Sequence, residues 1–299
     1  MSRSSGALPE PLLNRAFTVS DGMSRGLSRE RLRGRDLVCP TTAVRSARPP
    51  QTVAQLAAAY AEVLPPPWAF SHLTAARLLG WPTARPWRPT EPLHVIRSLD
   101  AAQLRRRGVV FHRGLELREL VLCNDLPVVA PAETWCDQAP QEPLDERVVL
   151  GDAAVNAWTG IPFTTLEAAV QARAGRRSVR ALREAIPLIR PRSRSARETL
   201  TRLAFHRAGL PEPELNAVIV DEAGGWLSES DFVWRRERVV AEYDGDHHRT
   251  DVRQWRRDHA RRRALVDNGW RLHILVADDL AGPMRITRMV DGIARDLGC

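Results

Sequence analysis

The alternation of apolar and polar positions is clearest in the last hundred residues. Residues 195–210 predict a helix, because Ser195 and Glu198 have the S-x-x-E spacing of a capping box and Gly209 stands where a helix ends. Three strand-like runs follow, at 215–221, 227–234 and 238–244. After them the sequence predicts a helix at about 250–268, a strand at 270–276 and a final helix from about 282. The expected order is αβββαβα, an α+β domain with a mixed central sheet.

The beginning of the chain predicts a different arrangement. At about 16–35 two short helices joined by a turn are expected, with Ser20 or Asp21 capping the first. This is the outline of a helix-turn-helix, whose second helix would carry Arg29 and Arg31 into the major groove of DNA. The alternative is a basic helix that only faces solvent.

Two linkers, at 47–53 and 189–195, enclose a middle region of mixed pattern. Helices are expected after the first linker, from Ser71 and after Pro131, with short strands between 92 and 129. The sequence therefore predicts three parts: a helix-turn-helix region at 1–50, a mixed α/β region at 51–190 and the C-terminal domain at 195–299.

The composition is that of an ordinary globular protein with an excess of positive charge. The net charge is +8, the pI is about 10.6, and lysine is absent, so all 44 basic residues are arginine. This charge is consistent with a polyanionic partner such as DNA, although a GC-rich genome explains the missing lysine more simply. Most of the excess lies in residues 1–190, with 25 arginines against 18 acids, whereas residues 191–299 hold 19 against 18.

The sequence also predicts the compartment. It contains no run of 18 or more apolar residues, so no membrane span is expected. The N-terminus lacks the apolar core and cleavage site of a signal peptide. The cysteines are scattered and form no C-x-x-C pair, which favours reduced thiols: Cys39, Cys123, Cys136 and Cys299. We therefore expect a cytoplasmic protein.

Carboxylates gather on two of the predicted C-terminal strands. Asp231 lies on the second strand and Glu242 on the third, and the short turn between the strands allows the two to meet. Glu242 and Asp244 share a parity and therefore a face of the third strand. Buried like charges are costly unless a cation neutralises them, and carboxylates with water are the usual ligands of Mg²⁺.

These acids predict a site for Mg²⁺, or Mn²⁺, with Asp231, Glu242 and Asp244 as ligands. His248 follows at the end of the strand, where its imidazole could accept a proton from water. The alternative is a charged hairpin edge with solvated acids.

The helix after these acids carries Arg253, Arg257 and Arg261 at i, i+4 and i+8. This spacing gives one basic stripe that could hold the phosphates of DNA, with strongly salt-dependent binding. A solvated helix face is the alternative. The isolated histidines are expected to have only structural roles: His72, His94, His112, His206 and His273.

The C-terminal pattern as a whole is similar to that of a known family. Its residues are Glu198, Asp231-Phe232, Val240-Ala241-Glu242-Tyr243-Asp244-Gly245, His248, Arg257-Asp258, Arg261, Leu265 and Gly269-Trp270. They resemble the restriction-endonuclease-like nucleases with the PD-(D/E)xK motif, and more closely the very-short-patch-repair-endonuclease-like domain of unknown function of actinobacterial proteins. The resemblance covers roughly residues 195–280. It implies that Asp231 and Glu242 bind the divalent ion and that Glu198 approaches the site from the first helix.

The sequence departs from the wider superfamily at Asp244, where a lysine is common. Either Asp244 joins the metal shell and His248 takes part of the catalytic role, or cleavage has been lost. Glu198 also has a simpler interpretation, as half of the capping box. The resemblance thus implies five catalytic candidates: Glu198, Asp231, Glu242, Asp244 and His248.

The front half resembles, more loosely, the winged-helix region of abortive-infection type IV antitoxin-like proteins, through residues 16–37, 69–82 and 127–139. This resemblance implies DNA binding and assigns no catalytic residue. The whole sequence therefore predicts a Mg²⁺-dependent DNA endonuclease or nicking enzyme. The alternatives are a non-catalytic DNA-binding regulator of the antitoxin kind that keeps the nuclease fold, and a module that binds another protein. A homodimer and a toxin or repair partner are compatible with these functions.

Overall fold

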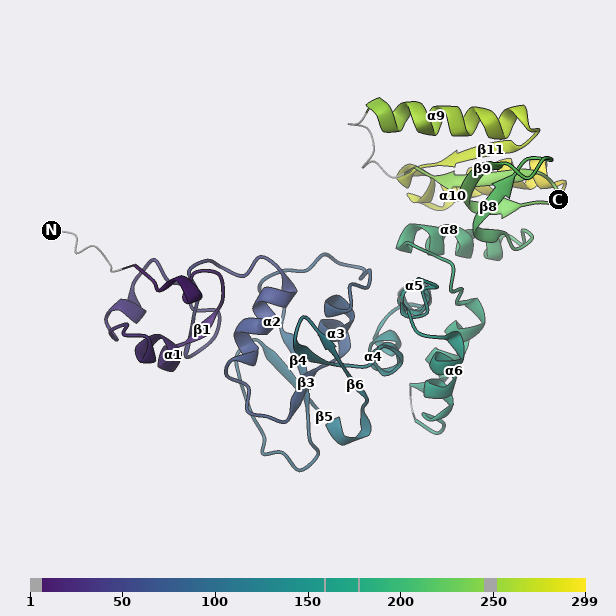
Figure 1. Cartoon of the computed structure of the whole chain (residues 1–299). Helices are drawn as coiled ribbons and strands as arrows, with labels where there is room; N and C mark the ends of the chain where they lie inside the picture. The colour runs from purple at the N-terminus through teal and green to yellow at the C-terminus, as the bar shows by residue number, and fades with distance from the viewer. Residues whose placement is uncertain (1–6, 159, 177, 245–251) are drawn as a thin grey trace. The chain divides into compact units, whose positions relative to one another are not determined.

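The computed structural model describes residues 7–158, 160–176, 178–244 and 252–299, without the side chains of 252–257. The chain folds into two compact units, Met1–Glu142 with Ala168–Arg176, and Pro143–Glu167 with Arg177–Cys299. Each contains helices and a mixed β-sheet (Figure 1), which confirms the expected α+β class. The linkers expected at 47–53 and 189–195 do not coincide with this division. Among the described residues, no helix has the length and apolar character needed to cross a bilayer.

The N-terminal part of the first unit has one short α-helix beside a two-stranded antiparallel sheet. Its elements are η1 (Glu10–Leu12), β1 (Phe17–Thr18), α1 (Val19–Ser24), η2 (Arg31–Arg33) and β2 (Val44–Arg45). The first predicted helix is confirmed as α1, but its cap is Thr18, whose hydroxyl accepts a hydrogen bond from the Asp21 amide.

The predicted second helix of the helix-turn-helix is wrong, because the chain forms only the single 3-10 turn η2 there. Gly26, at φ +86°, precedes this stretch and Gly34 ends the turn. The few residues between the two glycines cannot offset the cost of starting an α-helix.

A five-stranded mixed sheet forms the body of the first unit, with strand order β5-β4-β3-β7-β6. The elements are α2 (Val53–Ala61), β3 (Trp68–Phe70), α3 (His72–Leu78), β4 (Leu93–Arg97), β5 (Val109–Arg113), η3 (Leu115–Leu117), β6 (Leu120–Cys123), β7 (Leu126–Val129) and α4 (Pro131–Gln138). The expected strands between 92 and 129 and the helix from Ser71 are confirmed, since Ser71 is the N-cap residue of α3. Strand β3 was not expected. It has three residues, yet it lies between β4 and β7 and buries Phe70 completely.

The second unit begins with α5 (Leu144–Ala154), which packs against both α7 (Val179–Ala185) and α8 (Ala196–Arg207). The short turn η4 (Ala139–Gln141) ends the first unit before α5, η5 (Ile186–Leu188) follows α7, and α6 (Phe163–Gln171) has residues in both units. The buried carboxylate of Asp152 on α5 forms an ion pair with Arg202 on α8 at 3.0 Å. It also accepts hydrogen bonds from Thr199 Oγ1 and from the Arg190 amide. This buried polar cluster ties α5 to the C-terminal domain.

The C-terminal domain has the predicted element order αβββαβα. After α8 come β8 (Glu214–Val220), β9 (Trp226–Trp234), β10 (Val239–Tyr243), α9 (Val252–Asp267), β11 (Arg271–Leu275), η7 (Ala277–Leu280) and α10 (Pro283–Leu297). The strand order is β11-β10-β9-β8, with β10 and β11 parallel and the other pairs antiparallel. Helix α9 covers one face of this sheet, and α8 and α10 cover the other (Figure 1).

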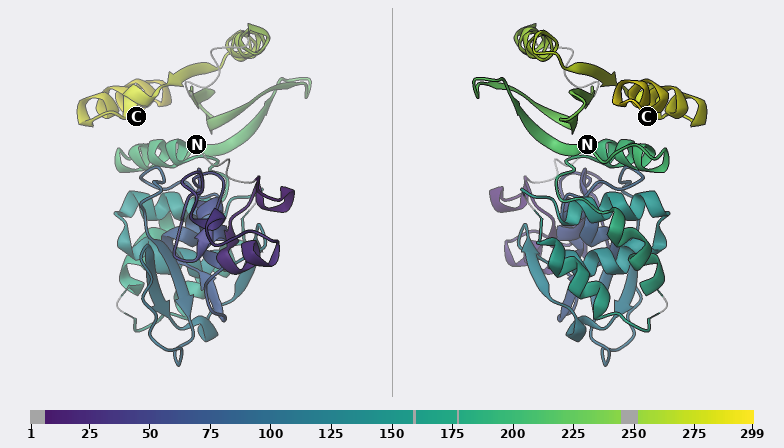
Figure 2. Two further views of the ribbon diagram at one scale, coloured as in Figure 1. Left: turned by 90° about the vertical axis from the view of Figure 1, so that its left-hand side faces the viewer. Right: turned by 90° about the vertical axis from the view of Figure 1, so that its right-hand side faces the viewer.

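The side chains of the β8–β9 hairpin switch from one face of the sheet to the other partway along its length. Leu215 packs on the face covered by α8 and α10, whereas Ala217, two residues further, packs in the cluster that contains Leu265 of α9. Asn216 lies between them with a φ of +45°, a left-handed conformation that interrupts the usual alternation of side chains. Figure 2 shows the resulting curvature of the hairpin.

Strand β8 is an edge strand of this sheet, and two arginines bind its backbone. Arg192 donates hydrogen bonds to the carbonyl oxygens of Leu215 and Asn216 at 2.9 and 2.7 Å. Arg235 donates to the Val218 carbonyl oxygen at 2.8 Å. Guanidinium groups therefore occupy backbone acceptors along this edge.

Candidate functional site

Asp231 lies where β9 loses regular pairing with both of its neighbours. The pairing with β10 ends one step before Asp231, which leaves Asp231 opposite Glu242. The pairing with β8 skips Asp231 and Asn216, which stand opposite each other. Asp231 Oδ2 instead accepts a hydrogen bond from the Tyr243 amide at 2.7 Å. The side chain thus replaces a backbone partner at the point where the strands separate.

Glu198 approaches the same level of the sheet from the first turn of α8. The Ser195 hydroxyl accepts a hydrogen bond from the Glu198 amide at 3.1 Å, which confirms the predicted helix cap. Glu198 Oε2 accepts hydrogen bonds from the Arg194 amide and from Asn216 Nδ2, at 2.9 and 2.7 Å. Glu198 is therefore part of the helix cap and is also tied to the strand residue opposite Asp231.

The electrostatics of Asp231 differ from those of an ordinary surface acid. Its pKa is raised to about 7, mainly by burial and further by the charges of Glu198 and Glu242, while the Tyr243 amide and Arg261 lower it. A carboxyl group in this environment either keeps a proton near neutral pH or is stabilised by a cation. Strongly perturbed acids of this kind are concentrated at functional sites.

Two arginines of α9 hold the neighbouring acids. Arg261 Nη1 and Nη2 contact the two Glu242 carboxylate oxygens at 2.7 and 3.0 Å. Arg262 Nη2 contacts Asp244 Oδ2 at 3.1 Å. In the part of the chain that the structure describes, the oxygens of Asp231, Glu242 and Asp244 do not form a group lying within 4.8 Å of one another. A shared ion at these three ligands requires Arg261 to release Glu242 and Arg262 to release Asp244.

Other predicted residues on and before α9 cannot be placed in this site. His248 and the side chains of Arg253 and Arg257 lie outside the described residues. Arg261 is the one member of the predicted phosphate-binding stripe whose side chain is described, and it binds Glu242. The stripe therefore stays a prediction.

The arginines that were expected to contact DNA from a recognition helix do not lie on such a helix. Arg31 is bound by Asp36 at 2.8 Å, and its side chain is only 10% exposed. Arg29 is exposed and precedes the single turn η2. Neither residue lies on a helix long enough to enter a groove, which corrects the predicted recognition helix.

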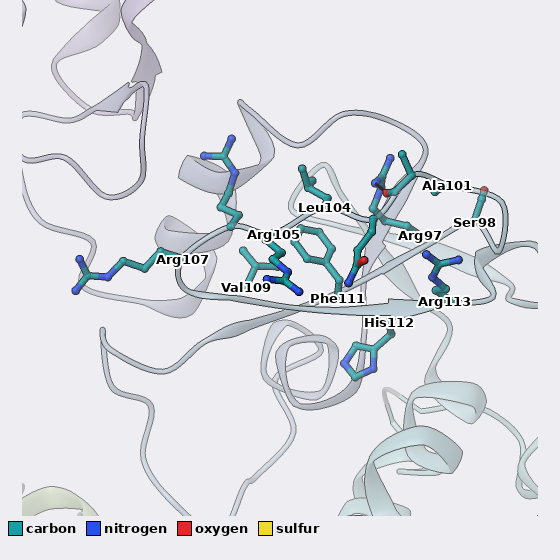
Figure 3. Close-up of a pocket in the computed structure, with 13 residues that line it drawn as sticks. Arg97, Ser98, Ala101, Leu104, Arg105, Arg107, Val109, Phe111, His112 and Arg113 are labelled. Carbon is teal, nitrogen blue, oxygen red and sulfur yellow. Dashed lines mark hydrogen bonds between the residues drawn. The ribbon is translucent and has the colours of Figure 1, made fainter.

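An arginine-rich cleft in the first unit was missed by the sequence analysis. It has a volume of about 540 Å³ and is formed by β4, β5 and the loop between them (Figure 3). Five arginines line it: Arg97, Arg105, Arg106, Arg107 and Arg113. The side chains of Arg97, Arg106 and Arg113 donate to backbone carbonyl oxygens, whereas Arg105 and Arg107 are exposed. The run of three arginines at 105–107 is the only signal of this cleft in the sequence.

Three histidines that are far apart in the sequence also meet in the first unit. His72, His94 and His112 each offer a ring nitrogen, and these nitrogens all lie within 4.8 Å of one another. Within the described residues, this is the only such group of three or more His, Cys, Asp or Glu side chains. The expectation that these three histidines are isolated is therefore wrong, because α3, β4 and β5 each supply one of them.

Comparison with known proteins identifies relatives whose function has not been assigned. The chain is 31% identical over 209 residues to two uncharacterized proteins of Mycobacterium tuberculosis, MT2308 of strain CDC 1551 and Rv2248 of strain H37Rv. The match covers 69% of this chain and 73% of each relative. No family model matches the chain, and no solved structure matches it significantly.

Proposed function

The chain belongs to the family of these two mycobacterial proteins, and we propose that its C-terminal unit is a divalent-metal-dependent nuclease domain that cleaves DNA. The proposal takes this domain to be restriction-endonuclease-like. The αβββαβα order and the mixed four-stranded sheet are compatible with that fold. The residues Glu198, Asp231 and Glu242, on which the resemblance depends, lie at one level of the sheet.

One observation carries the proposal, namely that acids from α8 and β10 act electrostatically on the buried acid of β9 at the point where the strands separate. Among the described residues, their oxygens do not all lie within 4.8 Å of one another, so the side chains would have to move to share an ion. Asp231 is mostly buried there and is influenced by the charges of both Glu198 and Glu242. Such a cluster is unfavourable unless protons or a cation neutralise it. Its donor atoms are all oxygen, which suits Mg²⁺ or Mn²⁺ better than softer metals.

Each residue of this site would have its own role in phosphodiester cleavage. A bound divalent ion would polarise the phosphate and activate a water molecule. The Tyr243 amide orients Asp231, and Arg261 holds Glu242 in place and balances its charge until DNA arrives. The phosphate of DNA can then attract the same guanidinium group and release Glu242 for ligation. His248 stays the proposed proton acceptor.

The first unit supports DNA as the substrate. Its cleft places five arginines around one cavity, and Arg105 and Arg107 are exposed there. Guanidinium groups recognise phosphate well, and several of them together make binding sequence-independent and dependent on salt. We propose this cleft as a DNA-binding surface in place of the missing recognition helix.

A second candidate function is a DNA-binding regulator that keeps the fold without cleavage. It is favoured by the ion pairs of Arg261 with Glu242 and of Arg262 with Asp244, because these neutralise two acids without a metal. The absence of lysine, which is common at the position of Asp244 in the superfamily, agrees with this alternative.

Cleavage of supercoiled plasmid DNA by the full chain with Mg²⁺ or Mn²⁺ tests the proposal. We expect nicked or linear product from the wild type, and a rate lower by roughly 10²-fold or more for Asp231→Asn and for Glu242→Gln. The matched control is Glu229→Gln, which changes a partly exposed acid of the same strand that is paired with Arg194. This variant should cleave like the wild type.

Duplex binding in the presence of EDTA, measured by fluorescence anisotropy, separates the two candidate functions. DNA binding that is unchanged in Asp231→Asn, without cleavage by either protein, identifies the regulator. Equal cleavage by the wild type and Asp231→Asn rules out the nuclease site described above.

A further inference from the structure

Three imidazole rings form a stacked cluster on one face of the sheet of the first unit. The rings of His72 and His112 are stacked with their centroids 3.6 Å apart, and the ring of His94 lies 5.2 Å from that of His112. His94 Nδ1 and His112 Nε2 are 3.0 Å apart. In Figure 3 the His112 ring projects from β5 on the side opposite Phe111, as expected of consecutive strand residues.

The backbone position and conformation of each histidine direct its ring toward the cluster. His94 and His112 lie on the neighbouring parallel strands β4 and β5, where Ile96 pairs with His112. His94 is two residues before Ile96, so His94 and His112 point to the same face. His72 begins α3 with a φ of +49°, an unusual conformation for a residue other than glycine. This conformation brings its ring onto that of His112.

The ring nitrogens of this cluster have the chemistry of metal ligands, because neutral imidazole is a common ligand of transition metals. Each neutral imidazole has one ring nitrogen with a lone pair. His72 Nδ1 lies 3.1 Å from the Ser71 hydroxyl, which can accept a hydrogen bond from Nδ1 when Nε2 is the ligand atom. Hydrogen bonding of the second ring nitrogen is typical of metal-bound histidine.

We propose that His72, His94 and His112 bind one transition-metal ion of the zinc class. Imidazole suits Zn²⁺, Co²⁺, Ni²⁺ and Cu²⁺, and three histidines with an open fourth position form a known type of reactive zinc site. Zn–N bonds of about 2.0–2.1 Å place neighbouring ligand nitrogens about 3.3 Å apart in a tetrahedron. The nitrogens of this cluster already lie within 4.8 Å of one another, and the stacked rings would rotate to direct their lone pairs at one ion.

A metal-free cluster with only a structural role explains less of the observed histidine geometry than a metal site does. One shared proton can satisfy the contact between His94 Nδ1 and His112 Nε2, but packing alone does not require three half-buried imidazoles with a left-handed residue among them. The neighbouring Arg118 and Arg173 both form ion pairs with Asp137, so Asp137 offers no cationic imidazole a dedicated partner. The metal site is independent of the proposed nuclease site, because its ligands are nitrogens and lie in the other unit.

Metal uptake by the full chain tests this inference. The protein is stripped with EDTA and then equilibrated with Zn²⁺ or Co²⁺. We expect at least one ion per chain from elemental analysis, and the visible absorption of tetrahedral cobalt. Replacing one ligand, as in His112→Ala or His94→Gln, should abolish the cobalt absorption and weaken Zn²⁺ binding by more than roughly 100-fold. Ser71→Ala, which removes the contact to His72 Nδ1, should weaken binding by about tenfold.

Two control variants locate the ion. His206→Ala removes an exposed histidine of the second unit and should keep the cobalt absorption and Zn²⁺ affinity of the wild type. Asp231→Asn removes a ligand of the proposed oxygen site and should keep the cobalt absorption of the histidine site. Unfolding of the metal-free variants by heat shows whether they are folded. If the wild type takes up no ion, if folded His112→Ala and His94→Gln keep the cobalt spectrum, or if Asp231→Asn loses the ion instead, the proposed site is overturned.

Discussion

Both terminal nitrogens of the Arg261 guanidinium contact the Glu242 carboxylate, at 2.7 and 3.0 Å. This pair links helix α9 to the end of β10 inside the candidate site. It neutralises a buried acid next to Asp231, whose own charge is unfavourable. The pair therefore determines whether Glu242 is available to a metal. Replacing Arg261 should change the stability of the protein.

Replacing Arg261 by glutamine should destabilise the metal-free protein. Glu242 then stays buried with only the more distant Arg262, at 3.9 Å, which we expect to lower the free energy of unfolding by about 1–3 kcal/mol. Mn²⁺ should restore part of this loss if it takes the place of the guanidinium group. Urea unfolding with and without Mn²⁺ measures both effects. Arg271→Gln is the control, because the partner of Arg271 is the partly exposed Asp296, and it should change stability by less than about 1 kcal/mol.

Asp231 should make the protein less stable as the pH rises. Its folded pKa is about 7 and its unfolded value about 3.8, so the folded state holds the proton more tightly between these limits. The stabilisation is complete below pH 3.8 and is lost as the pH rises through about 7. Asp231→Asn should therefore exceed the wild type in unfolding free energy at pH 8, by about 1–4 kcal/mol, and the difference should shrink at pH 5. A difference that does not change with pH contradicts this assignment.

The histidine cluster should have the opposite pH dependence. Burial lowers the folded pKa values of His72, His94 and His112 to about 4, below the ordinary value of 6.5, so the unfolded chain binds more protons between these limits. Stability is therefore lost as the pH falls from about 6.5 toward 4. In metal-free protein, His112→Gln should show a smaller drop in melting temperature between pH 7 and pH 5 than the wild type. His206→Gln should behave like the wild type.

The arginine-rich cleft should control affinity for DNA. We expect Arg105→Ala and Arg107→Ala each to weaken duplex binding for all sequences alike. Each should also lower the slope of log Kd against log salt by about 1, because each removes one phosphate contact. Arg31→Ala should have little effect on binding, since Arg31 is paired with Asp36. Anisotropy titrations at several salt concentrations give these slopes, and unchanged slopes for the cleft variants exclude it as the DNA-binding surface.

Within the second unit, substitutions in the buried ion pair of Asp152 and Arg202 should cause the largest loss of stability. Asp152→Ala leaves Arg202 buried without its carboxylate and should cost about 3–5 kcal/mol of unfolding free energy. The exposed pair of Glu214 and Arg235 provides the comparison, and Glu214→Ala should cost less than about 1 kcal/mol. Similar losses for the two variants would contradict the buried role of Asp152.

Local patterns were sufficient for most of the secondary structure of the C-terminal domain. The Ser195 cap, the alternation along β9 and β10, and Gly269 after α9 are signals within a few residues of one another. Together they predicted the order αβββαβα and a mixed sheet, both of which are confirmed. The acids were predicted to converge for the same reason, since Asp231 and Glu242 are separated by one short turn.

Features that depend on tertiary contacts were not predictable from local patterns. Strand β3 has only three residues, and its pairing with β4 and β7 makes it a strand. The approach of His72 to His112 requires the sheet of the first unit to be formed already. The left-handed conformation of Asn216 and the choice of Arg261 as the partner of Glu242 likewise depend on neighbouring elements. The charges of α9 alone suggested phosphate binding, because the sequence does not show which arginines reach back to the sheet.

The arginines along β8 limit how copies of this protein can associate. Unpaired strand edges are common places for chains to join into larger sheets or fibres. Here Val218 and Val220 are half-exposed, and an incoming strand would first have to displace Arg192 and Arg235 from the backbone oxygens they occupy. Lateral growth of the sheet is thereby disfavoured, and any stable dimer is expected to form through a different surface.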